Sequence, residues 1–110
     1  MIIVFKEKAT SDEISRVAED LDGYIKFVVD VEGEILTAGG TRHVDGEQIL
    51  LKEGSRQADL WGGGLDLETG GIDFDSMINI RPTQNNPSRE VLDEGIRKKV
   101  EGIVRKILIQ

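Results

Sequence analysis

The sequence predicts an α+β protein, built on a mostly antiparallel, twisted sheet of five or six strands with two amphipathic helices packed on one face. Apolar residues alternate with polar ones in several short segments, which is the spacing of half-buried strands. They follow the helical period in only two segments, one near each end of the chain. Glycine-containing turns separate these segments, and the predicted order is β-α-β-β-β-β-β-α.

The first two elements are a strand and a helix. Residues 1–5 are a continuous apolar run, which predicts a buried strand. Thr10 and Glu13 fit a capping box, and the apolar residues that follow predict a helix over residues 11–21. Gly23 supplies its stop.

The middle of the chain is predicted to be mainly β-structure. Residues 24–31 alternate with period two and form a hairpin with residues 34–38. Residues 41–48 are polar and are expected to be irregular, whereas residues 49–52 read as a short strand. Residues 58–67 predict another strand, and because three consecutive glycines interrupt it, we expect a bulge, a bend or the close approach of another backbone there.

The last two elements are a strand over residues 72–81 and a helix. The helix is expected to begin between Pro87 and Asp93 and to run to about Leu108. Its predicted buried face carries Leu92, Ile96, Val100, Ile103 and Ile107. Three acid-first i,i+4 ion pairs are predicted on the opposite face, namely Asp93–Arg97, Glu94–Lys98 and Glu101–Arg105. The first strand, first helix and second strand are compatible with a crossover that makes the two strands parallel.

Size and composition exclude several classes. We expect residues 1–110 to form one α+β domain, since two cores would each be marginal at this length. The formal net charge of −7 argues against nucleic acid as a partner. No apolar run approaches the roughly 20 residues that span a bilayer, so no membrane association is expected. The absence of cysteine excludes disulfides and suits a cytoplasmic location. No cofactor is expected.

Two stretches are distinctive, namely residues 58–62 (Ala-Asp-Leu-Trp-Gly) and residues 74–82 (Phe-Asp-Ser-Met-Ile-Asn-Ile-Arg-Pro). Both resemble a small bacterial and archaeal family known as a domain of unknown function. Shorter likenesses run over nearly the whole chain, including the segment Gly54-Ser55-Arg56-Gln57. The resemblance implies no activity.

Polar residues around the last predicted strand form the candidate ligand site. Alternation places Asn79 and Arg81 on the face opposite Phe74, and a short loop then brings Asn86 and Arg89. Guanidinium groups bind carboxylate or phosphate in bidentate geometry, so the cluster predicts an anion site. The alternative is that Arg81 pairs with a nearby aspartate and that the amides satisfy loop backbone. The candidate ligand-binding residues are His43, Asp75, Asn79, Arg81, Asn86 and Arg89.

Other chemistries have weaker support. His43, Asp45 and Glu47 would share one face of an extended segment and offer metal ligands, but Asp45-Gly46 is a turn dipeptide, so no metal site is expected. No Gly-x-Ser-x-Gly elbow frames a serine, and the glycine run at residues 62–64 lacks the Lys-Ser/Thr ending of a phosphate-binding loop.

Three functional hypotheses therefore stay open. The preferred one is a small non-catalytic module that binds an anionic ligand or a protein partner. The second is a hydrolase-type enzyme, in which His43 acts with an acidic residue beside Arg81. It requires His43 and Arg81 to be close in space. The third is a homo-oligomeric assembly protein that uses strand edges or Trp61 as contacts.

Overall fold

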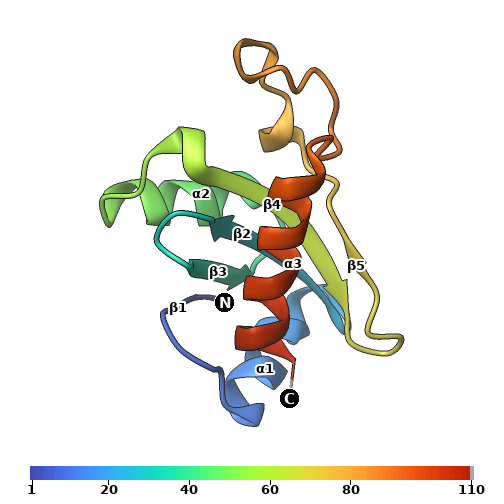
Figure 1. The fold of residues 1–110 in the computed structure, drawn as a ribbon. Helices are drawn as coiled ribbons and strands as arrows, with labels where there is room; N and C mark the ends of the chain where they lie inside the picture. Colours follow the sequence, from blue (N-terminus) through green and yellow to red (C-terminus); the bar gives the residue numbers. More distant parts are fainter. Residues whose placement is uncertain (110) are drawn as a thin grey trace.

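The computed structural model describes residues 1–109, which form a five-stranded antiparallel sheet, three α-helices and four short 3-10 turns. The strands are β1 (Ile2–Phe5), β2 (Tyr24–Asp30), β3 (Ile35–Gly39), β4 (Leu60–Asp66) and β5 (Ile72–Asp73), and the helices are α1 (Ser11–Ala18), α2 (His43–Lys52) and α3 (Glu94–Leu108). The sheet order is β1-β3-β2-β4-β5 (Figure 1). The α+β class and the antiparallel sheet are confirmed.

β3 lies between β1 and β2, the two strands that were predicted to be parallel. β3 pairs antiparallel with β1 on one side and with β2 on the other, so β1 and β2 run parallel without being neighbours. The tight connection from Asp30 to Ile35 makes β3 the partner of β2, because the Asp30 carboxylate accepts hydrogen bonds from two backbone N–H groups of the turn.

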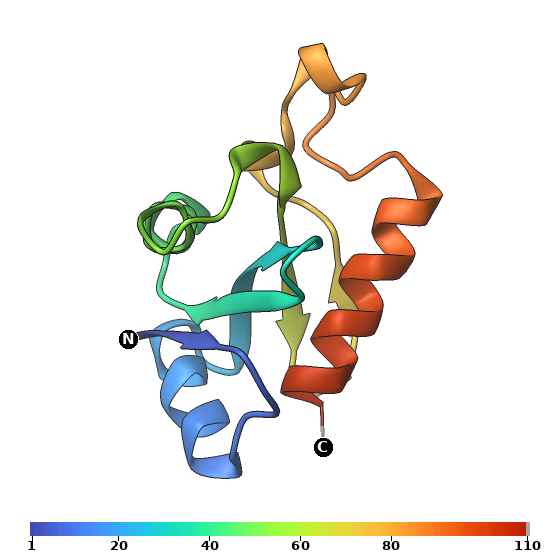
Figure 2. The same cartoon turned by 60° about the vertical axis from the view of Figure 1, so that its left-hand side comes forward.

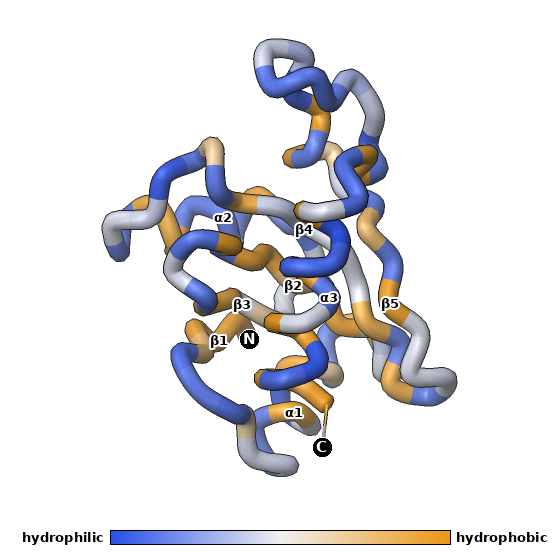
Figure 3. The backbone as a smooth tube through the Cα atoms, viewed as in Figure 1, coloured by the Kyte–Doolittle hydropathy of each residue, from blue (hydrophilic) through white to orange (hydrophobic). Residues whose placement is uncertain are grey.

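The two predicted helices cover one face of the sheet, and α2 covers the other (Figure 2). Ile25, Phe27 and Val29 of β2 belong to the larger core with α1 and α3, whereas Val28 packs with Leu50 of α2 in a smaller one. Hydrophobic residues follow the strands and the inner helix faces, and the loop at the top of Figure 3 is largely hydrophilic. The alternation read from the sequence of β2 is therefore confirmed.

α1 begins where the capping box predicts. The Thr10 hydroxyl accepts from the Glu13 backbone N–H at 3.2 Å, and the Glu13 carboxylate accepts from the Thr10 backbone N–H at 2.9 Å. The helix gives way to a 3-10 turn over Glu19–Leu21 and ends at Asp22, which has φ +52°. The predicted span of residues 11–21 thus comprises the α-helix and this turn.

The helix α2 corrects two predictions, because residues 41–48 were expected to be irregular and residues 49–52 to be a strand. Gly46 argues against a helix in the sequence, since glycine has a low intrinsic helix propensity. In the structure a Cβ at Gly46 would stand 2.4 Å from the Thr37 hydroxyl oxygen. The glycine therefore lets the helix lie directly on the sheet, and this packing outweighs its low helix propensity.

The three glycines of β4 are explained by close approach of side chains rather than by a bulge. A Cβ at Gly62 would lie within about 3 Å of Ser76 and His43, and one at Gly63 would meet the Phe27 ring and a backbone carbonyl. At Gly64 the site of a Cβ is filled by the Tyr24 ring. Each glycine thus makes room for a side chain or carbonyl lying across the strand.

The strand predicted over residues 72–81 is also wrong, because only Ile72 and Asp73 join the sheet. Ser76 then caps a 3-10 turn over Met77–Asn79, and its hydroxyl accepts from the Ile78 N–H at 3.2 Å. The alternation that suggested a strand is that of an irregular segment, in which Phe74 enters the core and Met77 is exposed.

α3 confirms the second predicted helix, with Asp93 as its N-cap. Leu92 precedes it and is 52% exposed, so its predicted place on the buried face is wrong. Of the three predicted i,i+4 pairs, only Glu101–Arg105 forms, at 2.8 Å. No helix within residues 1–109 has the length and apolar character needed to cross a membrane.

Candidate functional site

A pocket of about 380 Å³ opens on the α2 side of the sheet. It lies between the start of α2, the beginning of β2 and residues 75–78, and Arg89 also lines it. Its lining residues are Tyr24, Lys26, Arg42, His43, Val44, Asp75, Ser76, Met77, Ile78 and Arg89. The segment of residues 74–91, which supplies half of this lining, is called the pocket loop below.

Three of the six predicted site residues meet in this pocket, namely His43, Asp75 and Arg89. They come from α2 and from the two ends of the pocket loop. Tyr24 and Lys26 also line the pocket but were not predicted as site residues. Their shared place on the polar face of β2 was visible in the sequence, whereas the strand order that sets them beside His43 was not.

His43 is held by the backbone of the glycine strand. Its Nε2 lies 2.7 Å from the Gly63 carbonyl oxygen. A carbonyl only accepts hydrogen bonds, so Nε2 carries the proton and, in the neutral ring, Nδ1 is an acceptor. Burial lowers the pKa of His43, and the nearby Lys26 charge acts in the same direction, against the Gly63 hydrogen bond and the carboxylates of Asp73 and Asp75. The ring is therefore neutral at physiological pH.

The cations of the pocket differ in how far they are already paired. Arg89 donates from Nε to Asp75 at 3.0 Å, and its two terminal nitrogens have no partner among residues 1–109. Arg42 is paired with Asp45 at the rim. The half-buried Lys26 forms no ion pair among residues 1–109. Lys26 and the free edge of Arg89 are thus available to an anion.

Tyr24 has a structural role, because both its hydroxyl and its ring are engaged in contacts within the fold. Its hydroxyl donates to Asp73 Oδ2 at 2.6 Å, and burial together with this bond raises its pKa. The ring lies across Gly64, so the β2 wall of the pocket is fixed by one hydrogen bond and one close packing contact.

Asn79 and Asn86, two further predicted site residues, hold the pocket loop together. The side-chain Nδ2 of Asn79 donates to the carbonyls of Gly62, Phe74 and Arg89 at 2.9 to 3.0 Å, and its Oδ1 accepts from the Gly62 N–H at 2.9 Å. Asn86 repeats the pattern further along the chain, with three carbonyl acceptors and one backbone donor. Both side chains are buried, so their amides replace the ladder of the strand that was expected here.

Arg81 is the third predicted residue that lies outside the pocket. Its guanidinium donates to the carbonyls of Gln57 and Leu60 and to Gln84 Oε1, and it stacks on Trp61. It forms no ion pair with Asp59, Asp73 or Asp75 among residues 1–109, so carbonyls take the place of the carboxylates considered for it. Burial lowers its pKa, whereas the charge of Glu47 opposes this effect.

The hydrolase hypothesis finds little geometric support. Arg81 is bonded at the start of β4 and does not line the pocket of His43. The Nε2–Cδ2 edge of His43 faces β4 on the side of Ser76, so the lone pair of Nδ1 points away from that hydroxyl. Within residues 1–109 no three His, Cys, Asp or Glu side chains are grouped to hold a metal ion.

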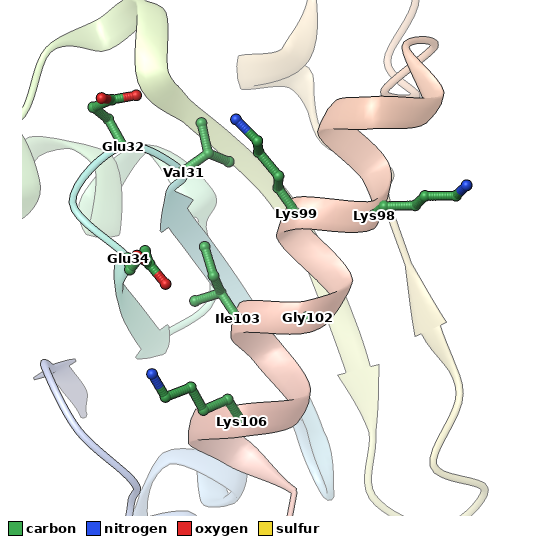
Figure 4. Close-up of a pocket in the computed structure, with 8 residues that line it drawn as sticks. All are labelled: Val31, Glu32, Glu34, Lys98, Lys99, Gly102, Ile103 and Lys106. Carbon is green, nitrogen blue, oxygen red and sulfur yellow. The ribbon is translucent and has the colours of Figure 1, made fainter.

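A second, larger groove of about 460 Å³ lies between the β2–β3 hairpin and α3 (Figure 4). Lys99 and Lys106 stand on the helix side, and Glu32 and Glu34 stand on the hairpin side. With Lys98, which also lines the groove, the helix side carries three cations that face two carboxylates on the hairpin side, and the glutamates offset much of the attraction for an anion. This groove offers less for a small anion than the pocket of His43.

Fold and pocket define a small α+β protein with an antiparallel sheet and a polar pocket on one face. The chain belongs to the family described as "Protein of unknown function (DUF5674)", whose model matches residues 2–107. The resemblance to a family of unknown function is thereby confirmed. No curated protein and no solved structure matches the chain.

Proposed function

We propose that this protein is a non-catalytic binding module for a small anionic ligand, which it holds in the pocket between α2 and the pocket loop. The observation that carries the proposal is the convergence of Lys26, His43 and Arg89, from three separate parts of the chain, on one pocket. A carboxylate or phosphate group there meets an ammonium without an ion pair and two free guanidinium nitrogens.

The surroundings favour this use of the pocket. The protein carries a formal net charge of −7, whereas the residues that line the pocket include three cations, Lys26, Arg42 and Arg89, and one carboxylate, Asp75. The positive end of the α2 dipole, at His43, borders the same space and adds to the attraction for an anion. Asn79 and Asn86 serve as the scaffold that keeps Arg89 in position, since the Arg89 carbonyl accepts from Asn79 at 3.0 Å.

The proposal is tested by NMR titration of ¹⁵N-labelled protein with inorganic phosphate and with acetate. We expect shifts confined to residues of the pocket and weakened binding in Lys26→Met and Arg89→Ala. Arg56→Ala is the matched control, because Arg56 is exposed and lies outside the pocket lining. Saturable binding that survives both pocket variants, or no binding of either anion at tens of millimolar, would refute the proposed site.

A further inference from the structure

The single histidine of the chain lines the pocket, and one of its two ring nitrogens is a hydrogen-bond acceptor in the neutral ring. Its Nε2–H is used by the Gly63 carbonyl, and the neighbouring ring atom Cδ2 lies closest to Gly62. Nε2 and Cδ2 form one edge of the imidazole, so the opposite edge, which carries Nδ1, is turned away from β4. Nδ1 has no hydrogen-bond partner among residues 1–109. With this tautomer the half-buried neutral imidazole can accept a hydrogen bond from a donor on a ligand in the pocket.

The donor is better supplied by a hydroxyl than by an ammonium group. Lys26 lines the same pocket as His43 and forms no ion pair among residues 1–109, whereas the nearby carboxylates are already bonded, Asp73 to Tyr24 and Asp75 to Arg89. A second cation in the pocket would therefore be repelled by the Lys26 ammonium. A hydroxyl donates a proton without adding charge. The anionic part of the same ligand would meet Lys26 and the free nitrogens of Arg89.

The remaining wall of the pocket is apolar. Val44, Met77 and Ile78 line it, and Met77 is 65% exposed although it is a large hydrophobic residue. An exposed methionine beside a polar pocket is suited to covering the hydrocarbon part of a ligand, because its side chain adapts to irregular shapes.

We infer that the ligand of this pocket is a small hydroxycarboxylate with an aliphatic part, recognised through its carboxylate by Lys26 and Arg89 and through its hydroxyl by His43 Nδ1. The inference rests on the proposed binding function and gives it a chemical class.

Three probes with the same carbon skeleton separate the possibilities: 2-hydroxy-4-methylpentanoate, 4-methylpentanoate and leucine. At pH 7.5 we expect the hydroxy acid to bind tightest by calorimetry. The acid without the hydroxyl should bind about tenfold more weakly, the factor that the loss of one hydrogen bond typically gives. Leucine should bind more weakly still, because its ammonium meets Lys26.

The ring nitrogens of His43 supply a direct readout, since there is only one histidine to label. The ¹⁵N resonance of Nδ1 should move to lower frequency with the hydroxy acid and stay nearly in place with 4-methylpentanoate. His43→Phe should bind the two acids equally, with Trp61 fluorescence reporting that the variant is folded.

A pH series on the wild-type protein tests the hydrogen bond to Nδ1 in both protonation states of the ring. The charged and titratable groups around His43 are Tyr24 and Lys26 on β2, Asp73 on β5, Asp75 and Arg89 on the pocket loop, and Arg42 and Asp45 on α2. Protonation of His43 converts Nδ1 from an acceptor into a donor. A hydroxyl accepts as well as it donates, so the preference for the hydroxy acid should persist below the pKa of His43, as read from its own ¹⁵N titration, and its loss there would contradict a hydrogen bond to Nδ1.

The outcomes distinguish the two proposals. Equal binding of hydroxy acid and plain acid, or the tightest binding by leucine, would overturn the hydroxycarboxylate inference and leave an anion site standing. Failure of all three probes, together with failure of phosphate and acetate, would remove the binding function as well.

Discussion

The Arg81 guanidinium lies 4.0 Å from the centroid of the Trp61 ring, and both side chains are buried. The stack joins the pocket loop to β4, and the hydrogen bonds of Arg81 to the carbonyls of Gln57 and Leu60 strengthen the same junction. Cation–π contacts are stronger where water is excluded, so Arg81 serves as a structural tie at the base of the loop.

Arg81→Lys should therefore destabilise the protein although it keeps the charge. A single ammonium does not reproduce the planar fork, and the loss of at least one charged hydrogen bond predicts a decrease of about 2 kcal/mol in the free energy of unfolding. Urea denaturation followed by circular dichroism measures this. The exposed Arg56→Lys should stay within about 0.5 kcal/mol of the wild type. Equal effects of the two changes would contradict the role given to Arg81.

Asn79→Ala should cost about 3 kcal/mol or more. The change leaves the buried Gly62 N–H and several carbonyls without their side-chain partner, and each unsatisfied buried group carries a penalty of about 1–3 kcal/mol. Gln48→Ala is a matched amide deletion at an exposed position of α2 and should be nearly neutral. Hydrogen exchange should show faster exchange of the Gly62 amide in folded Asn79→Ala, and unchanged protection there would argue against the proposed contact.

Two helix glycines should respond to alanine with opposite signs. At Gly102 of α3 a Cβ would meet no atom within 4 Å, so Gly102→Ala should stabilise the protein by about 0.5–1 kcal/mol through helix propensity. At Gly46 of α2 the Cβ would stand 2.4 Å from the Thr37 hydroxyl oxygen, so Gly46→Ala should be destabilising. The midpoints of urea denaturation of the two variants and the wild type measure these changes in stability. Stabilisation by both substitutions would show that α2 does not pack on β3 as described.

The pKa of His43 predicts a pH dependence of stability. Because burial holds this pKa below the ordinary histidine value of 6.5, the unfolded chain binds more protons than the native state between the two values. The free energy of unfolding should therefore fall as the pH drops from about 6.5 through the lower, native pKa, and it should be flat with respect to this group above pH 7. The difference between wild type and His43→Gln, measured from pH 7.5 to 5, isolates the contribution. If the wild type instead gained stability relative to His43→Gln on acidification, the native pKa of His43 would lie above that of the unfolded chain, and the prediction would be wrong.

The elements that could be predicted are those whose signal is local. The capping box at Thr10, the alternation in β2 and the apolar stripe of α3 each depend on neighbours in sequence, and the structure confirms them. α2 was missed because its stability comes from contact with the sheet at Gly46. The strand expected over residues 72–81 fails for a related reason, since its backbone partners are side-chain amides from Asn79 and Asn86.

Three of the six site residues predicted from the sequence line the pocket. His43, Asp75 and Arg89 were selected for their chemistry, and the fold brings them together. The alternation over residues 24–31 puts Lys26 on the polar face of a strand and goes no further, because its place beside His43 depends on the pairing of β2 with β4 and on the position of α2 over them. Long-range pairing of this kind has no local signature.

The side chains that hold the pocket loop in place are different from those proposed to bind the ligand. Asn79 and Asn86 are uncharged at every ordinary pH and their hydrogen bonds are shielded from solvent, so acid or added salt should leave the wall where it is. Among the groups proposed to contact the ligand, His43 responds to proton concentration, and the attraction of the Lys26 and Arg89 charges for an anion weakens with added salt. A change in affinity with pH or ionic strength can thus be attributed to recognition itself, which makes this pocket a favourable place to measure electrostatic selectivity in isolation.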